Sequence, residues 1–277
     1  MSLSNSVAGT FALIEGRKLY YHDVGNGPVV LCIHGGAPGA TGWGNFGRNV
    51  PELSRYFRLL IVDLPGYGRS EVPDSELDRN TAYAQMMIGL LDQLSITQAH
   101  VLGMATGGAV GMIMAIDHPQ RVDRLMLVSS AGSRSMFGMK PAVMASKTYL
   151  GDGGPSREKM RAYLDQLIFN KNLITDDVVE ERYLASIDPE FLDNVAKGKA
   201  GKGATMRELW KVADQIACRT LIVWGRENRA HSFESAMLLH SLIPDSQVHV
   251  FGQCGLWVPY EKQHEFNQLT ISFLNAP

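Results

Sequence analysis

The residues best placed for chemistry lie in the segment GMATGG, which runs from Gly103 to Gly108. It follows the apolar run Ala99 to Leu102, which is typical of a strand, and it precedes a stretch of helical composition. A sharp strand-to-helix turn of the form G-x-S-x-G exposes a nucleophilic serine at its apex. The glycines of that pattern are present, but Ala105 stands in the serine's position. Because alanine has no nucleophilic atom, the segment predicts the turn without its nucleophile.

A second glycine-rich segment, His34 to Ala40, directly follows another predicted strand. Glycines let backbone N–H groups approach a ligand oxygen closely, as an oxyanion hole requires. We therefore expect Gly36 and Ala37 to lie against a bound ligand. The backbone N–H of Thr106 should serve the same hole, and we expect its side chain to point elsewhere.

The elements that must position these segments alternate between short β-branched runs and longer helical patterns. This alternation indicates βαβ units around a mostly parallel sheet. The predicted strands are Lys18 to Asp23, Val29 to Ile33, Phe57 to Val62, Ala99 to Leu102, Leu125 to Val128, Thr220 to Trp224 and Gln247 to Phe251. Thr81 to Leu94 has the apolar spacing of an amphipathic helix.

The alternation breaks between residues 133 and 206, which are rich in helical patterns and contain no convincing strand. An insertion that follows the strand ending at Val128 should cover the carboxyl ends of the parallel strands, where open α/β sheets bind ligands. We expect one core, residues 1–132 and 207–277, with a helical lid formed by residues 133–206.

Several segments, taken in order, resemble the α/β-hydrolase superfamily, and more narrowly the carbon–carbon bond hydrolases of meta-cleavage products, the 2-hydroxy-6-oxo-dienoates of aromatic degradation. They are His34 to Trp43, Gly103 to Gly108, Ser135 to Phe137, Asn172 to Thr175, Trp224 to Arg226 and Cys254 to Trp257. The resemblance covers nearly the whole chain. It implies an α/β-hydrolase fold, a small-molecule ligand, no cofactor or metal, and a homo-oligomer.

The departures from the family pattern fall on the three triad positions. Ala105 replaces the nucleophile. Where the family pattern resembles W-G-R-D-D-R, with its second aspartate as the acid, this chain has Asn228, and where it resembles C-G-H-W, Leu256 replaces the histidine. Leucine cannot shuttle a proton and asparagine cannot stabilise an imidazolium. The chain should therefore lack Ser-His-Asp hydrolysis. Three substitutions at the catalytic positions indicate a natural lineage that lost or changed its reaction.

The resemblance also implies which residues bind the ligand. Arg182 matches a lid arginine that contacts the polar end of the dienoate, although an arginine of a surface salt bridge would look the same in sequence. Asn45 matches an asparagine near that end of the substrate, Trp257 follows the histidine position, and Met104 stands where the family usually has asparagine. With Gly36, Ala37 and Thr106, these are the expected ligand-binding residues.

Other residues are candidates for a substitute triad. Thr106 carries a hydroxyl beside the apex of the turn, but we expect that side chain to face away. His34 fits a structural hydrogen-bonding role better than a general base. His231 is the best histidine candidate for new chemistry, although a surface position is the favoured interpretation. A packing role is favoured for Cys32 and Cys254, and Glu227, next to the acid position, need not face the same cavity.

Composition limits the partners. A formal net charge of −2 leaves no basic surplus to neutralise phosphates, so nucleic acid and anionic membranes are not expected partners. The Gly/Lys-rich patch Lys197 to Lys202 reads as a solvated loop rather than a phosphate site. An odd count of three cysteines does not suit a disulfide framework, and the chain shows neither a secretion signal nor a membrane span. We expect a cytoplasmic protein.

Three functions remain open at this point. The first is binding of a small oxo acid without serine hydrolysis, either as a noncatalytic binder or as a catalyst of a reaction that needs only orientation and an oxyanion hole. The second is a working hydrolase with an atypical nucleophile or water. The third is a noncatalytic partner of an active paralogue.

Overall fold

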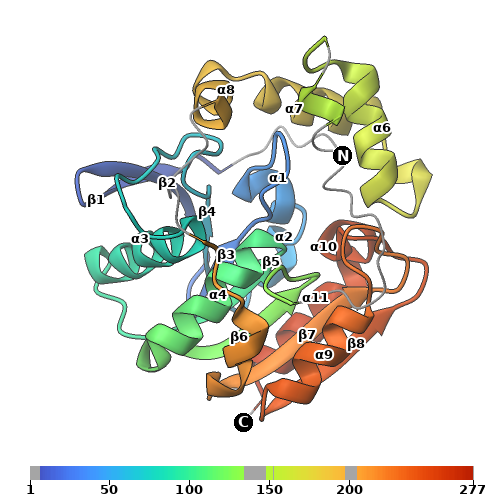
Figure 1. Ribbon diagram of the computed structural model, residues 1–277. Helices are drawn as coiled ribbons and strands as arrows, with labels where there is room; N and C mark the ends of the chain where they lie inside the picture. Colours follow the sequence, from blue (N-terminus) through green and yellow to red (C-terminus); the bar gives the residue numbers. More distant parts are fainter. Residues whose placement is uncertain (1–6, 134–147, 152, 197–204, 277) are drawn as a thin grey trace.

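The computed structural model describes residues 7–133, 148–151, 153–196 and 205–276. The described strands are β1 (Thr10–Ile14), β2 (Arg17–Val24), β3 (Val29–Ile33), β4 (Arg58–Val62), β5 (Ala99–Met104), β6 (Val122–Val128), β7 (Arg219–Gly225) and β8 (Ser246–Phe251). They form an eight-stranded sheet in the order β1-β2-β4-β3-β5-β6-β7-β8 (Figure 1). The two pairings of β2, with β1 and with β4, are antiparallel, and the other pairings are parallel.

Helices cover both faces of this sheet. The helices α3 (Arg79–Gln93), α4 (Thr106–Asp117) and α9 (Glu234–Leu242) pack on one face, with the 3-10 segments η1 (Pro119–Arg121) and η3 (Leu209–Gln215) beside them. The other face carries α1 (Gly42–Phe46), α2 (Val50–Leu53), α10 (Val258–Glu261) and α11 (Gln263–Leu274).

The strand sequences explain the two layers. In β3, Leu31 and Ile33 belong to the core under α3 and α4, whereas Val30 and Cys32 belong to the core on the opposite face. Successive side chains of a strand point to opposite faces, so a strand buried on both faces must be apolar throughout. The continuous apolar runs seen in the sequence are therefore the signature of a covered sheet.

The mostly parallel sheet and its flanking helices confirm the predicted fold. The seven predicted strands are present, most of them one to three residues longer than expected, and the predicted helix 81–94 is α3. The sequence interpretation missed β1, which pairs with β2 through a tight hairpin with Glu15 at φ 49° and Gly16 at φ 78°. An edge strand followed by an unusual turn residue leaves only a weak pattern in the sequence.

Between β6 and β7 the described residues form helices and no strand. These are α6 (Arg157–Leu167), η2 (Lys171–Leu173), α7 (Asp176–Ser186) and α8 (Pro189–Ala196), which lie together at one end of the molecule (Figure 1). Apolar residues of α6 and α7, including Leu164 and Val179, join the core on the α1 face. The segments 134–147 and 197–204, which contain the Ser135 to Phe137 motif and the 197–202 patch, lie outside the described residues.

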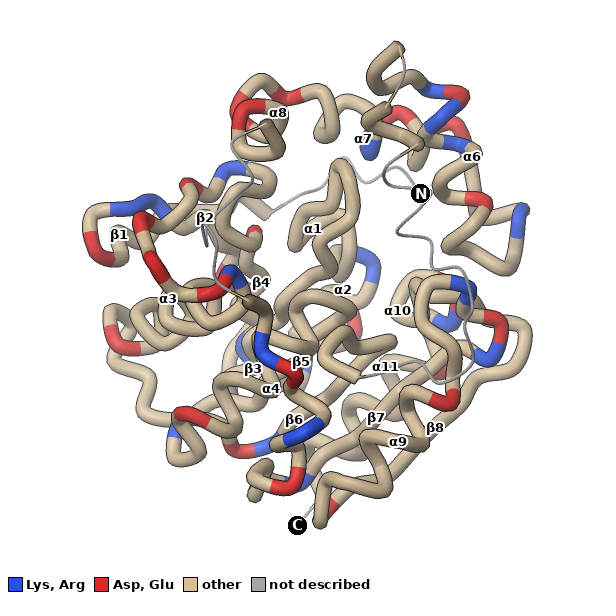
Figure 2. The backbone as a smooth tube through the Cα atoms, viewed as in Figure 1, with Lys and Arg blue, Asp and Glu red and all other residues tan. Residues whose placement is uncertain are grey.

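Charged residues of both signs are interspersed along the outer helices and loops (Figure 2). In the part of the chain that the structure describes, no helix is long and apolar enough to cross a membrane. The same residues contain no cluster of three or more His, Cys, Asp or Glu side chains that could hold a metal ion.

Candidate ligand-binding site

The turn between β5 and α4 is built as the sequence predicts. Ala105 stands at its apex with φ 46° and ψ −112°, a conformation that a residue with a side chain rarely adopts. A Cβ at Gly103 would lie 2.3 Å from the carbonyl oxygen of Gly107, and a Cβ at Gly107 would lie 2.1 Å from that of Ile33. The flanking glycines are thus required by packing alone, whatever residue occupies the apex.

The loop after β3 is held against this turn by hydrogen bonds. The Gly36 N–H donates to Thr106 Oγ1 at 3.2 Å, and the Tyr67 hydroxyl donates to the Gly36 carbonyl oxygen at 2.9 Å. The expectation that the Thr106 side chain would point away was therefore wrong. Its hydroxyl accepts a bond from the loop that was predicted to supply oxyanion contacts, because the first turn of α4 directs it toward Gly36.

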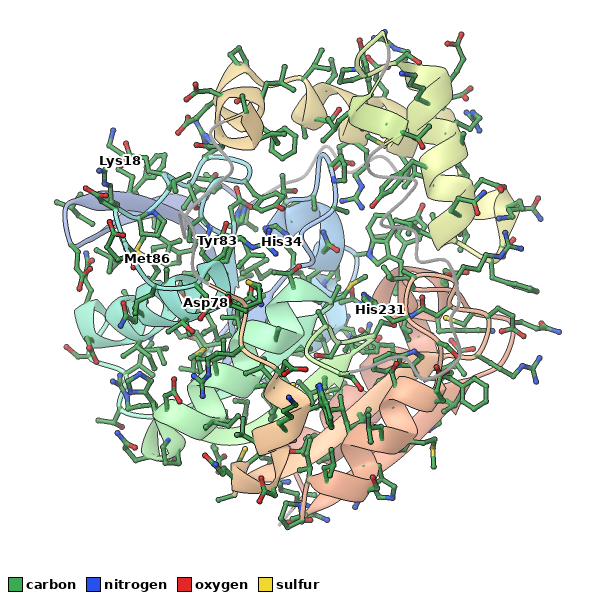
Figure 3. The ribbon with its side chains drawn as sticks, in the orientation of Figure 1. Lys18, His34, Asp78, Tyr83, Met86 and His231 are labelled. Atoms are coloured by element: carbon green, nitrogen blue, oxygen red, sulfur yellow. The ribbon has the colours of Figure 1, made fainter. Side chains whose placement is uncertain are left out.

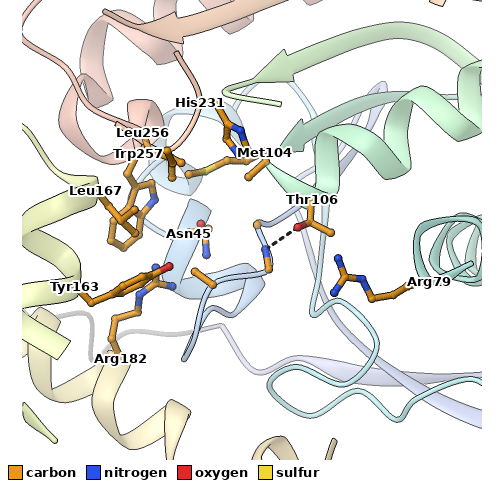
Figure 4. A pocket seen from close by; sticks show the side chains of 15 residues that line it. Asn45, Arg79, Met104, Thr106, Tyr163, Leu167, Arg182, His231, Leu256 and Trp257 are labelled. Carbon is orange, nitrogen blue, oxygen red and sulfur yellow. Dashed lines mark hydrogen bonds between the residues drawn. The ribbon is translucent and has the colours of Figure 1, made fainter. Parts of the chain in front are cut away.

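One pocket of about 290 Å³ lies between this turn and the helices inserted after β6 (Figure 4). Its volume suits a small ligand. The described residues that line it are Gly35, Gly36, Ala37, Asn45, Arg79, Met104, Ala105, Thr106, Tyr163, Leu167, Arg182, Ala230, His231, Leu256 and Trp257. All seven residues that the sequence nominated for ligand binding are in this lining, together with two of the three triad positions.

Arg182 is the most unusual residue of the pocket. It lies in α7, is 4% exposed, and its Nε and Nη1 atoms are buried without a hydrogen-bond partner. Its guanidinium carbon lies 4.7 Å from the centre of the Trp257 ring, within the range of a cation–π contact. Burial lowers the pKa of this guanidinium, although arginine stays charged. A buried cation with unsatisfied donors is costly, and an anion in the pocket would satisfy it.

Trp257 and Asn45 complete the wall near Arg182. The Trp257 ring stacks on Tyr260 at 4.4 Å, and its Nε1 atom is buried without a partner. Asn45 is buried at the end of α1, where its Nδ2 donates to the Thr41 carbonyl oxygen at 2.8 Å. This side of the pocket therefore combines an aromatic surface with polar groups.

Asn228 lies behind the pocket rather than in its lining. Its Oδ1 accepts hydrogen bonds from the backbone N–H groups of Ala230 and His231, at 2.9 and 3.1 Å, and its Nδ2 is buried without a partner. The side chain thus closes the turn after β7. Leu256, by contrast, lies in the lining with its N–H bonded to the Leu167 carbonyl oxygen at 2.8 Å.

The two candidate histidines differ in their surroundings. His34 is fully buried in the interior (Figure 3). Its Nε2 accepts from the Leu64 N–H at 2.8 Å and its Nδ1 lies 2.7 Å from the Gly35 carbonyl oxygen, so both nitrogens are engaged in the structural role that was favoured. His231 is half-buried and lines the pocket, which corrects the surface position favoured from sequence. Desolvation lowers the pKa of its imidazole, so it is neutral at pH 7.

Besides Gly35, four further lining residues were not nominated from sequence. Tyr163 and Leu167 lie in α6, Arg79 begins α3, and Ala230 follows Asn228. Burial raises the pKa of Tyr163 to about 12. The helical spacing of Met160, Tyr163 and Leu167 could have marked one buried face of α6, but no local pattern indicates that it faces a cavity.

The remaining candidates have other roles. Cys32 is buried, and burial raises the pKa of its thiol to about 12. Cys254 is also buried, and its N–H donates to Glu227 at 3.0 Å. Glu227 is paired with Arg226 and does not line the pocket. The two cysteines are packing residues, as the sequence favoured, and the Glu227 side chain does not reach the pocket.

The mostly parallel sheet covered by helices on both faces, with a strained turn after β5 beside a pocket, is the architecture of an α/β hydrolase. The profile of the α/β hydrolase fold family matches residues 28–263. The chain belongs to that family, and within it to the meta-cleavage product hydrolases, as its relatives indicate.

A 2-hydroxy-6-oxo-6-phenylhexa-2,4-dienoate hydrolase from Burkholderia cepacia is 31% identical over 98% of each chain. A 2-hydroxy-6-oxo-2,4-heptadienoate hydrolase from Pseudomonas putida is 33% identical over 100% of this chain and 99% of its own length. Among solved structures, a meta-cleavage product hydrolase from Pseudomonas fluorescens IP01, a serine-to-alanine variant complexed with acetates, superposes with a TM-score of 0.85 at 32% identity. That match covers 96% of this chain and 97% of the other.

Proposed function

We propose that this protein binds a small oxo acid in the pocket beneath α6 and α7 and does not carry out Ser-His-Asp hydrolysis. The relatives are named for the hydrolysis of 2-hydroxy-6-oxo-dienoates, so a compound of this chemistry, from the degradation of aromatic compounds, is the proposed ligand. The carboxylate, or the 2-oxo acid group as a whole, lies against Arg182.

The observation that carries this proposal is the unpartnered Arg182. Arginine presents a planar fork that fits a carboxylate with two parallel hydrogen bonds. Within the described lining there is no Asp or Glu that could take this place. An anionic ligand therefore supplies the missing acceptors, and the Trp257 ring shields the ion pair from water.

The absence of hydrolysis follows from the side chains around Ala105. Among the described residues that line the pocket, none is Ser or Cys, and the hydroxyl groups belong to Thr106 and Tyr163. The Thr106 hydroxyl accepts from the Gly36 N–H, and within the described residues it forms no hydrogen bond to His231 that could activate it. Backbone donors and binding alone give about 10³- to 10⁴-fold acceleration over water, far below a complete triad.

His231 supports a second candidate, catalysis without a protein nucleophile. A neutral imidazole in the pocket could act as a general base toward the ligand or toward water. Tautomerisation of a dienol needs only such a base and oxyanion contacts. Hydrolysis by water would need the same base together with a positioned water molecule.

The decisive measurement is a visible absorption time course of the purified protein mixed with a 2-hydroxy-6-oxo-dienoate. We expect a rapid spectral shift that then persists, because the conjugated dienolate is bound but not cleaved. In Arg182→Gln the shift should require about 10- to 100-fold more ligand, since hydrogen bonds to a charged group contribute about 1.5–3 kcal/mol. Arg157→Gln, which removes an exposed arginine of α6 paired with Glu180, is the matched control and should behave as wild type.

A positive control for cleavage is the variant Ala105→Ser/Asn228→Asp/Leu256→His. Triad members act as a unit, so we expect decay of the band only when all three residues are present. Decay at an enzymatic rate in the wild-type protein would refute the noncatalytic proposal. If His231→Gln then abolished that decay, the second candidate would replace it.

We further propose a cytoplasmic homo-oligomer. Support for the compartment comes from three free cysteines, two of them buried. Support for self-association comes from the family resemblance and from β8, an edge strand with one unpaired side in the described sheet. Gel filtration of the protein alone and with an active paralogue tests this, and it also tests the role of a noncatalytic partner.

A further inference from the structure

One backbone N–H of the loop after β3 has its direction fixed by the peptide to which it belongs. In the peptide between Gly35 and Gly36, the carbonyl oxygen lies 2.7 Å from Nδ1 of His34. Because Nε2 of His34 accepts from the Leu64 N–H at 2.8 Å, its Nδ1 carries the proton and donates to this oxygen. The N–H and C=O groups of a trans peptide point in opposite directions. The Gly36 N–H is therefore directed away from His34.

The Thr106 hydroxyl stands in front of this N–H. Its Oγ1 accepts from the Gly36 N–H at 3.2 Å (Figure 4). A Cβ at residue 36 would lie 2.8 Å from Thr106 Oγ1, so the hydroxyl is already as close to this loop as packing allows. A ligand oxygen that bound to the Gly36 N–H would have to displace the hydroxyl. The backbone donor that was predicted for an oxyanion hole is thus satisfied inside the protein.

The Thr106 hydroxyl still has a hydrogen to donate. A threonine hydroxyl accepts through its lone pairs and donates its one hydrogen. In the parts of the chain that the structure describes, this hydroxyl accepts from Gly36 and has no acceptor for its own hydrogen. Thr106 is half-buried and lines the pocket, so the hydrogen is available to a ligand there. Accepting from an N–H also makes the hydroxyl a stronger donor, because successive hydrogen bonds polarise one another.

The place of Thr106 in the pocket decides which part of the ligand it meets. Thr106 lies on one side, and Arg182 lies on another side next to Tyr163 (Figure 4). A ligand whose carboxylate is bound at Arg182 therefore reaches Thr106 with a group remote from that carboxylate. The other hydroxyl among the described lining residues belongs to Tyr163, on the side of Arg182.

We propose that Thr106 is a specificity residue, whose side-chain hydroxyl binds the ligand's remote keto oxygen in place of the Gly36 N–H. This rests on the proposed function, since it assumes that the carboxylate lies at Arg182. The hydroxyl accepts from Gly36 and donates to the keto oxygen, which is an uncharged acceptor. The site therefore selects acids that carry a second carbonyl group over acids that carry only an alkyl chain at this position.

The test is isothermal titration calorimetry with 6-oxoheptanoate and heptanoate, which have equal chain length and differ only in the keto group. The keto group is placed at C6 because the relatives are named for 6-oxo compounds. We expect the wild-type protein to bind 6-oxoheptanoate about 3- to 10-fold more tightly than heptanoate, the effect of one hydrogen bond between uncharged groups. Arg182→Gln should weaken the binding of both acids.

Substitutions of hydroxyl groups identify the donor. Thr106→Val keeps the shape of the side chain without the hydroxyl, and it should abolish the preference because the new methyl group covers the Gly36 N–H. Thr106→Ser should keep the preference. Tyr163→Phe removes the other lining hydroxyl and should keep the ratio of the two affinities. Thr97→Val, at an exposed threonine outside the lining, should behave as wild type.

Infrared spectroscopy of 6-oxoheptanoate labelled with ¹³C at C6 reports the hydrogen bond directly. In the wild-type protein the bound keto band should lie at lower frequency than in an aprotic solvent, because a hydrogen bond weakens the C=O bond. In Thr106→Val the band should return toward the aprotic frequency, which a purely structural role of Thr106 would not produce. A wild-type band at the aprotic frequency would overturn the proposal even if Thr106→Val failed to fold.

The remaining outcomes separate this proposal from the proposed function. If the two acids bind equally, if neither binds, or if Tyr163→Phe rather than Thr106→Val removes the preference, the role of Thr106 is wrong. The proposed function then stands if the dienoate still gives its Arg182-dependent spectral shift. If the dienoate gives no shift either, both proposals are wrong.

Discussion

Ala105 holds a backbone conformation that favours glycine. Its φ is 46° and its ψ is −112°, and its Cβ has room because residue 35 is a glycine: a Cβ at Gly35 would lie 3.1 Å from it. In an active relative, such strain is the cost of exposing a nucleophile. Here the strained turn remains although its apex carries only a methyl group.

We expect Ala105→Gly to stabilise the protein by about 1 kcal/mol, because relief of backbone strain outweighs the greater entropy of the unfolded chain. Urea denaturation measures this difference. Ala109→Gly provides the matched control, since Ala109 is buried within α4 and should lose about 1 kcal/mol or more on the same change. Equal losses in the two variants would show that the turn at Ala105 is not strained.

At the scale of elements, α10 connects the inserted helices to the core. Glu261 accepts hydrogen bonds from the N–H groups of Phe169 and Asn170, at 2.7 and 3.1 Å, and from that of Gly255 at 2.8 Å. The end of α6 is thereby bound to the turn that carries Leu256 and Trp257. The pocket wall formed by α6 depends on this carboxylate.

Glu261→Gln should lower the free energy of unfolding by about 1–2 kcal/mol, because an amide NH₂ replaces one of the two carboxylate oxygens that accept from backbone N–H groups. Binding of a dienoate should weaken as well, since α6 carries Tyr163 and Leu167 into the lining. Chemical denaturation and the spectral titration measure the two effects. Glu265→Gln, an exposed change on α11, should alter neither by more than about 0.5 kcal/mol.

At the scale of the molecule, the parallel sheet brings distant segments to one edge. Ala105 follows β5, Asn228 follows β7 and Leu256 follows β8, and these parallel strands have their carboxyl ends at the same edge of the sheet. The loop after β4 is fixed to the rest by Asp63, whose carboxylate accepts from the N–H groups of Gly42 and Arg69 at 2.7 and 3.1 Å. Burial raises the pKa of this carboxyl to about 6.

This raised pKa predicts a pH dependence. Because an unfolded Asp has a pKa near 3.9, the folded state binds the proton more tightly, and the contribution of Asp63 to stability falls as pH rises from about 4 through 6. Relative to Asp63→Asn, the wild type should gain about 2 kcal/mol between pH 7 and pH 4.5. Urea denaturation of both proteins at pH 7 and at pH 4.5 measures this gain. Other titrating groups contribute equally to the two proteins, so their effects cancel in the difference. A constant difference between the two proteins would mean that the folded-state pKa is ordinary.

Local patterns were sufficient for much of the fold. The continuous apolar runs such as Val29–Ile33 predicted a sheet covered on both faces, and the Gly103 to Gly108 segment predicted the strained turn. β1 was missed because an edge strand need not alternate regularly and because Glu15 at positive φ is not a recognisable turn residue. Six of the seven nominated binding residues lie in one lining because they stand at or after the ends of β3, β5 and β8, which reach the same edge of the sheet, whereas Arg182 enters it from α7.

By itself, the sequence determined which atoms are present at the catalytic positions, since the side chains of Ala105, Asn228 and Leu256 follow directly from residue identity. Only the tertiary structure decided that Thr106 bonds to Gly36, that His231 lines the pocket, and that Arg79 and Arg182 face it from opposite sides. The physical reason is the distance along the chain over which each feature is determined. Strand period and turn geometry are set by neighbouring residues, whereas the direction of a side chain into a shared cavity depends on the packing of elements far apart in the chain.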